Sequence, residues 1–105
     1  MSITDSPKNP ESCDNMVDVR AGVDAVDAQL VNLLAQRFGY MDAAARIKTE
    51  RNAVRDEARK QQVLANVKDA ARNAGIPAEV VGDLWELLVE ASIAYELEQW
   101  DANRA

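Results

Sequence analysis

Histidine is missing from this chain of 105 residues. Its absence excludes every Ser-His or Cys-His nucleophile pair and removes the commonest general base near neutral pH. The single cysteine, Cys13, cannot form a disulfide within the chain, and no cysteine and histidine cluster exists to hold zinc. If the protein is an enzyme, we expect no imidazole base, no metal and no cofactor.

Positive charge is also scarce, with 12 basic against 18 acidic residues and a net charge of −6. This balance disfavours nucleic acid, because a phosphate backbone would be repelled. No apolar run approaches the roughly 20 residues that span a bilayer. The polar start, Met1 to Asn15, lacks the order of a signal peptide, so we expect a cytoplasmic protein without membrane contact.

Hydrophobic residues make up 48% and charged residues 29% of the chain, a balance typical of a soluble globular domain. A chain this short buries a modest core alone, so a partner subunit is plausible. Residues 1–15 contain two prolines and no periodic apolar pattern, which predicts a flexible leader. Residues 16–105 then form the domain.

A long helix is predicted from about Met16 to about Arg51, about 50 Å in length. Its stripe recurs at spacings of three and four: Val19, Val23, Val26, Leu30, Leu33, Arg37, Met41, Ala44 and Lys48. One 105-residue monomer cannot cover such a stripe along its whole length. A second copy of the chain is the economical way to bury it.

Two further helices follow a connection over residues 52–56. Asp56 is a suitable N-cap for the second helix, which we expect to end at Gly75. Pro77 then falls just inside a third helix that continues to about Trp100. No segment alternates like a strand. The sequence therefore predicts an all-α subunit with one long, one short and one medium helix.

Polar residues interrupt these apolar stripes. Arg37 and Lys48 are eleven residues apart on the long helix, so they point the same way about 16 Å apart. Arg59 begins the inner face of the second helix, and Ser92 and Glu96 lie within the stripe of the third. Buried cations are costly without partners, so either protein carboxylates neutralise them or they bind a small anion.

Several arrangements of these charges stay open. Each basic side chain could bury only its stem, and Arg37 with Glu96 or Lys48 with Asp56 could form plain ion pairs. Arg20 precedes Arg37 by seventeen residues, about 25 Å along a straight helix, so the two cannot share one ligand within a chain. In an antiparallel dimer, Arg20 would instead enter the pocket of the partner subunit.

The ordered set of charges resembles the helical chorismate mutases. The matching pieces are Val19-Arg20, Val26-Asp27, Leu30, Leu33-Leu34, Arg37, Lys48, Val54-Arg55-Asp56, Arg59, Glu90-Ala91-Ser92-Ile93 and Glu96. The resemblance implies a domain-swapped, intertwined homodimer of three-helix subunits with two shared active sites. It also implies the rearrangement of chorismate, a small dicarboxylate, to prephenate in aromatic amino acid biosynthesis. That pericyclic reaction needs no proton transfer, which suits a chain without histidine.

The resemblance also implies residue roles. Arg37 and Arg20 of the partner subunit would bind the two carboxylates, and Lys48 would contact a carboxylate and the ether oxygen. Asp56 would lie by the ring hydroxyl, Arg59 would support the carboxylates and Ser92 would orient the substrate. Val89 and Ile93 would form apolar walls, and Glu96 would face the ether oxygen.

Two residues depart from the family pattern. Where the bacterial enzymes carry Gln, this chain has Glu96, which must be protonated to donate a hydrogen bond to the ether oxygen. Where the family often places Glu on the substrate hydroxyl, it has Lys60. The second departure leaves room for isochorismate pyruvate lyase activity, although the Val54–Arg59 segment and Ser92 favour the mutase. A helical dimerisation module is the alternative that is not an enzyme.

Overall fold

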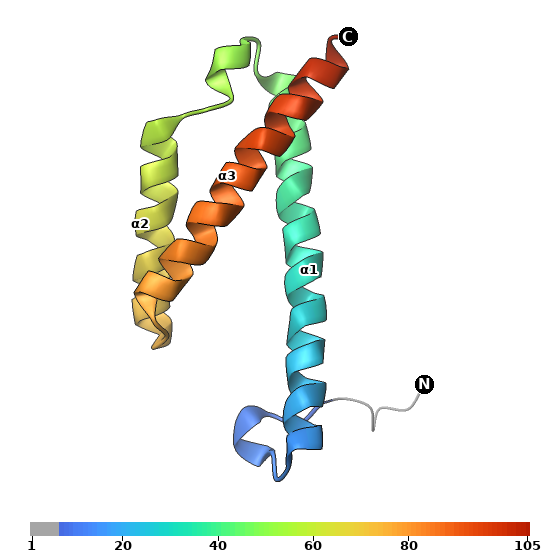
Figure 1. Cartoon of the computed structure of the whole chain (residues 1–105), viewed down its shortest axis with the longest axis vertical. Coiled ribbons are helices and arrows are strands. Elements are labelled where there is room, and N and C mark those ends of the chain that lie inside the picture. Colours follow the sequence, from blue (N-terminus) through green and yellow to red (C-terminus); the bar gives the residue numbers. More distant parts are fainter. Residues whose placement is uncertain (1–6) are drawn as a thin grey trace. The chain divides into compact units, whose positions relative to one another are not determined.

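The computed structural model describes residues 7–105, and the regular elements among these residues are all helices, with no strand. The helices are α1 (Met16–Ile47), α2 (Glu57–Ala74) and α3 (Ala78–Asn103), as Figure 1 shows. Two short 3-10 turns, η2 (Pro10–Ser12) and η3 (Arg51–Ala53), precede and follow α1. Within the described residues, the predicted all-α class with one long, one short and one medium helix is confirmed. Residues 1–6 of the predicted leader lie outside them, and its flexibility stays a prediction.

The chain divides into two compact units, one ending at Arg37 and the other running from Phe38 to Ala105. In the first unit, Asn15 caps α1 by accepting a hydrogen bond from the backbone of Asp18 at 2.9 Å. Lys8 pairs with the Asp18 carboxylate at 3.3 Å. A backbone N–H from Asp14 also reaches that carboxylate and, with Lys8, lowers its pKa. The segment before α1 is thereby attached to the first turn of the helix.

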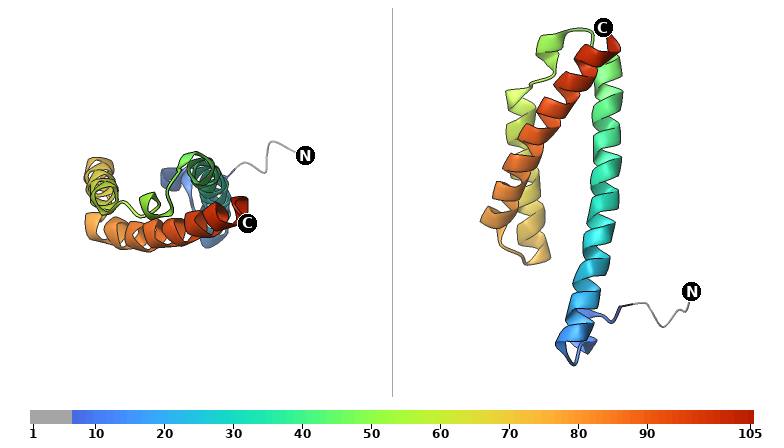
Figure 2. Two further views of the ribbon diagram at one scale, coloured as in Figure 1. Left: turned by 90° about the horizontal axis from the view of Figure 1, so that it is seen from above. Right: turned by 45° about the vertical axis from the view of Figure 1, so that its right-hand side comes forward.

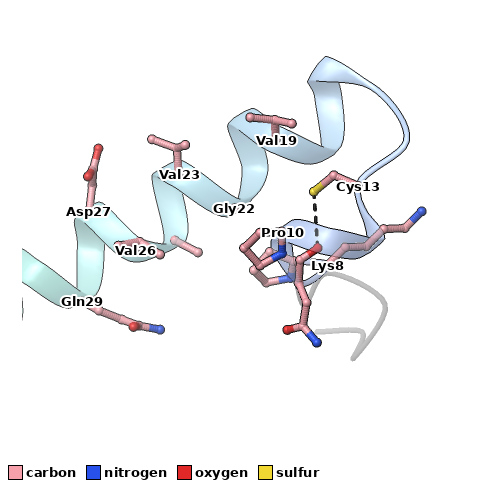
Figure 3. A pocket seen from close by; sticks show the side chains of 12 residues that line it. Lys8, Pro10, Cys13, Val19, Gly22, Val23, Val26, Asp27 and Gln29 are labelled. Carbon is pink, nitrogen blue, oxygen red and sulfur yellow. Dashed lines mark hydrogen bonds between the residues drawn. The ribbon is translucent and has the colours of Figure 1, made fainter. Parts of the chain in front are cut away.

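A shallow pocket lies between this attached segment and the first turns of α1 (Figure 3). Pro10 and Cys13 line one side, and Val19, Val23 and Val26 line the other. The Cys13 thiol donates to the carbonyl of Asn9 at 3.6 Å. None of the predicted site residues lines this pocket, so it is not the predicted anion site.

The second unit contains α2 and α3, which lie side by side and run in opposite directions (Figure 1). Asp56 caps α2 by accepting a hydrogen bond from the backbone of Arg59. Gly75 ends the helix with a φ of 75°, a left-handed conformation that glycine adopts without strain. The predicted cap and stop signals are therefore both confirmed.

The far half of α3 lies beside the last turns of α1, which belong to the same unit (Figure 2). The rings of Phe38 and Tyr95 meet edge to face, with centroids 5.0 Å apart. The Tyr95 hydroxyl donates to Asp42 at 2.7 Å, which raises the tyrosine's pKa. Since the buried apolar residues are few and small, such polar contacts carry much of this packing.

Three helix boundaries differ from the predictions. Helix α1 ends at Ile47 instead of about Arg51, where Trp100 of α3 and Arg104, the residue after α3, bind the carbonyls at the helix end. Helix α3 continues to Asn103, past the predicted end near Trp100. Pro77 occupies the N-cap position, one residue before the helix rather than inside it. None of the described helices carries an apolar stretch long enough to cross a membrane.

Candidate functional site

The clearest candidate site is an ion pair between Lys48 and Glu96. The Lys48 ammonium lies 2.7 Å from Glu96 Oε2, and the glutamate side chain is only 5% exposed. No hydrogen bond of acceptable geometry from the described residues reaches this buried oxygen. The short distance and the absence of a hydrogen bond are compatible if charge attraction, rather than a directed hydrogen bond, holds the two side chains together. We therefore read the contact as an ion pair with unused acceptor capacity.

The ammonium is placed by the end of α1 and by the connection that follows. Lys48 is the first residue after the helix, and its N–H still bonds to Ala44 as a helical residue would. Its Nζ atom also lies 3.5 Å from the carbonyl of buried Val54, at the long limit for a hydrogen bond. Lys48 thus projects from a fixed helix end toward α3, with 30% of its side chain exposed.

Two arginines attach the 48–56 connection to α3. Arg51 makes two hydrogen bonds to the Asp101 carboxylate, at 2.9 and 3.1 Å, and thereby lowers its pKa. Arg55 binds Glu90 in the same forked way, at 2.6 and 3.2 Å. Forked arginine–carboxylate pairs fix orientation as well as distance. The connection therefore has a defined position along α3 on both sides of the Lys48–Glu96 pair.

Glu90 also accepts a hydrogen bond from Lys60, whose ammonium lies between Glu86 at 2.6 Å and Glu90 at 2.7 Å. Arg55 first and Lys60 second lower the pKa of Glu90 from 4.5 to about 2. Glu86 and then Glu90 raise the pKa of Lys60. Only 10% of the lysine side chain is exposed. Lys60 therefore joins α2 to α3.

The inner face of α3 carries the remaining predicted residues of this helix. Val89, Ser92 and Glu96 are buried, and Ile93 is partly buried. The Ser92 hydroxyl donates to the carbonyl of Leu88 at 2.7 Å, one turn back along the helix. An apolar wall, a hydroxyl and a carboxylate thus lie on consecutive turns of one helix.

Asp56 and Arg59 lie at the start of α2 and do not join this pair. The Asp56 carboxylate is used as the N-cap, so it is not the partner of Lys48 that a plain bridge would have required. Arg59 is exposed and donates to Gln62 on its own helix at 2.7 Å. Its predicted support of the substrate carboxylates stays a prediction.

Arg20 and Arg37 belong to the first unit. Arg20 is exposed on α1, whereas Arg37 is partly buried and has interactions of its own. The structure does not place either arginine relative to Lys48. The structure therefore brings together two of the predicted residues, Lys48 and Glu96, and leaves the carboxylate-binding role of the arginines as a prediction.

Sequence reasoning missed the residues that hold the connection in place. Glu90 was noted only as part of a motif, and Trp100 only as an aromatic helix end. A usable signal existed for Glu90, because Glu86 and Glu90 are spaced to face one cation. No comparable signal marked Arg104, which follows α3 and reaches back to α1.

Comparison with known proteins adds two findings. The family model described as chorismate mutase type II matches residues 19–97. An isochorismate pyruvate lyase of Pseudomonas aeruginosa is 29% identical over 97 residues, which cover 92% of this chain and 96% of that protein. All of the predicted site residues fall inside the range that the family model matches.

Proposed function

Because the chain belongs to the chorismate mutase type II family, whose model matches residues 19–97, we propose that it converts chorismate to prephenate. The observation that carries this proposal is the Lys48 ammonium, 2.7 Å from a buried Glu96 carboxylate. The reaction breaks an ether C–O bond while a C–C bond forms, so negative charge develops on the ether oxygen. A fixed ammonium suits that oxygen because preorganised charge costs no rearrangement during the reaction.

Glu96 is the second group at the ether oxygen in this proposal. A carboxylate would repel the developing negative charge, so Glu96 acts only when it carries a proton and donates it in a hydrogen bond. No hydrogen bond from the described residues occupies Oε2, so a proton on this atom could be donated to the ether oxygen. Val89 and Ile93 would flank the ring, and Ser92 would turn from Leu88 to a substrate carboxylate.

The carboxylates of chorismate would be bound by Arg37 and by Arg20 of the partner subunit, with Arg59 in support and Asp56 near the ring hydroxyl. This arrangement requires an intertwined homodimer. The first unit supports it, because α1 exposes large apolar side chains along the predicted stripe, among them Val23, Val26, Leu30 and Leu33. Exposed apolar surface of this extent is typical of an interface. We also propose that residues 16–105 form the enzyme domain, that residues 1–15 precede it as a short leader, and that the enzyme is cytoplasmic.

Isochorismate pyruvate lyase activity is the second candidate, favoured by the Pseudomonas aeruginosa relative of that name. It would release salicylate and pyruvate from the same pocket. The Val54–Arg59 segment and the buried Ser92 favour the mutase. In contrast, Glu86 and Glu90 bind the Lys60 ammonium, which weakens recognition of the substrate hydroxyl by Lys60 and so favours the lyase.

The decisive experiment supplies chorismate and isochorismate separately to the purified protein. Prephenate from chorismate supports the mutase, and salicylate with pyruvate from isochorismate supports the lyase. If neither substrate is converted, both proposals fail and the helical dimerisation module is favoured. Under that reading, Arg37→Leu would be neutral or stabilising, whereas under either enzyme reading it would abolish substrate binding.

A further inference from the structure

The backbone at the end of α1 is closed by side chains from the last turn of α3 and the residue after it. The Lys48 carbonyl accepts hydrogen bonds from Arg104 Nη2 at 2.8 Å and from Trp100 Nε1 at 3.0 Å. The Ala45 carbonyl accepts from Arg104 Nη1 at 3.1 Å. The last carbonyls of a helix have no partner within the helix. Here the carbonyl of Ala45 in the last turn and that of Lys48, the residue after the helix, are bound by residues more than fifty positions along the chain.

The two donors also hold each other. The Arg104 guanidinium lies over the Trp100 ring, with its central carbon 4.1 Å from the ring centroid. The same guanidinium donates to the Trp100 carbonyl at 3.2 Å. A planar guanidinium with several donors in fixed directions can reach both carbonyls of α1 while it stays on the ring. The pair is therefore arranged before any ligand binds.

Helix α3 consequently contacts both the side chain and the backbone of Lys48. Its ammonium meets Glu96, and its carbonyl meets Trp100, which is four residues further along α3 and so on the same side. Arg104 lies four residues further again and joins the same row. Since α1 stops at Ile47, these contacts replace the helical hydrogen bonds that would otherwise hold the Lys48 carbonyl.

We propose that Trp100 and Arg104 are positioning residues, which set the Lys48 ammonium for the reaction by holding its backbone. The inference rests on the proposed function and extends it to two residues that need not touch the substrate. A displacement of the catalytic group by about 1 Å can lower a rate about 100-fold. Loss of either donor should therefore act on turnover more than on substrate binding.

The first test compares Arg104→Ala and Trp100→Phe with wild type in steady-state kinetics on whichever of the two substrates the protein converts. We expect kcat to fall about 10- to 100-fold while KM changes less than about twofold. Arg104→Lys, which keeps the charge but has a single donor nitrogen, should restore part of the loss. Arg72→Ala is the matched control, because Arg72 pairs with Asp69 three residues earlier on exposed α2 surface. An unchanged kcat in both test variants would overturn the inference.

A double-mutant cycle with Lys48→Ala distinguishes positioning from a general structural effect. If Arg104 acts through Lys48, adding Arg104→Ala to Lys48→Ala should lower kcat no further. If it lowers kcat by the same factor as in wild type, the two residues act independently and the inference fails.

Backbone hydrogen exchange gives a readout that needs no turnover. Amides between Lys48 and Val54 should exchange about tenfold faster in Arg104→Ala and Trp100→Phe than in Arg72→Ala. Should wild type convert neither substrate, the proposed function falls, and exchange alone then decides whether these residues hold the Lys48 backbone. Equal exchange in all three variants would overturn the inference even in an active enzyme.

Discussion

The ammonium of Lys48 and the Oε2 atom of Glu96 lie 2.7 Å apart, with the lysine on the connection after α1 and the glutamate buried on α3. Removal of the lysine should therefore lower both the catalytic rate and the free energy of unfolding. For Lys48→Ala we expect kcat/KM for chorismate to fall about 100- to 1,000-fold, the range for loss of one group that stabilises developing negative charge. Steady-state kinetics measures this, and circular dichroism with size-exclusion chromatography should show an intact, folded dimer.

The control for this variant is the double change Lys48→Ala with Glu96→Gln. Lys48→Ala alone leaves a buried carboxylate without its cation, which lowers the free energy of unfolding. The second change removes that carboxylate, so stability should recover while activity does not. An active Lys48→Ala variant would contradict the proposed role of the ammonium.

Glu96 makes a separate prediction about its hydrogen bond to the ether oxygen. If the side chain must donate that bond, a neutral amide should replace it, because an amide always carries a donor. We expect Glu96→Gln to keep kcat/KM within about tenfold of wild type, and Glu96→Ala, which has no donor, to lose about 100-fold. Steady-state kinetics on both variants tests this. A Glu96→Gln variant as inactive as Glu96→Ala would count against the role.

Glu90 should make stability depend on acid pH. Arg55 and Lys60 lower its pKa from 4.5 to about 2 in the folded protein. A lowered folded pKa stabilises the fold at any pH above the unfolded value, and this contribution is lost as pH falls from 4.5 toward about 2. Urea unfolding should therefore find Glu90→Gln less stable than wild type at pH 6, with the difference shrinking toward pH 2.

The matched control for the Glu90 experiment is Glu98→Gln, which removes one exposed carboxylate from the same helix. It shares the change in net charge but not the contacts to Arg55 and Lys60. A difference between Glu90→Gln and wild type that stays constant down to pH 2 would mean that the ion pairs do not couple stability to protonation.

Gly75 predicts a backbone effect. Its φ of 75° lies in the left-handed region, and nothing crowds a side chain there. Gly75→Ala should therefore lower the free energy of unfolding by about 1–2 kcal/mol through backbone strain alone. Gly75→Asn should cost less, because asparagine tolerates this conformation better. Equal losses for the two variants, measured by urea unfolding, would indicate a cause other than φ.

The parts of the fold that follow from local chemistry were predictable. Asp56 as an N-cap and Gly75 as a stop depend on the chain within a few residues, and both were confirmed. The end of α1 was not predictable, because the groups that close it, Trp100 and Arg104, are distant in sequence. The residues from Ile47 to Arg51 show no local preference that would end the helix there, because tertiary contacts impose this boundary.

The candidate site was predictable in its members but not in its pairs. Lys48 and Glu96 were both expected inside, yet the plain bridges considered were Arg37 with Glu96 and Lys48 with Asp56. The Asp56 carboxylate caps its own helix, so Glu96 is the buried carboxylate that lies near Lys48. Lys60 was treated as a question of substrate recognition, whereas Glu86 and Glu90 bind it in the structure.

Helix α3 fixes the position of the 48–56 connection along its length. Four of its side chains and the residue after it contact that connection from Glu90 to Arg104. Their positions fall within an arc of about 140° around the helix axis. One inserted or deleted residue within this stretch would rotate everything beyond it by about 100° and shift it by 1.5 Å. Length variation among relatives should therefore be tolerated in the α2–α3 turn and selected against between Glu90 and Arg104.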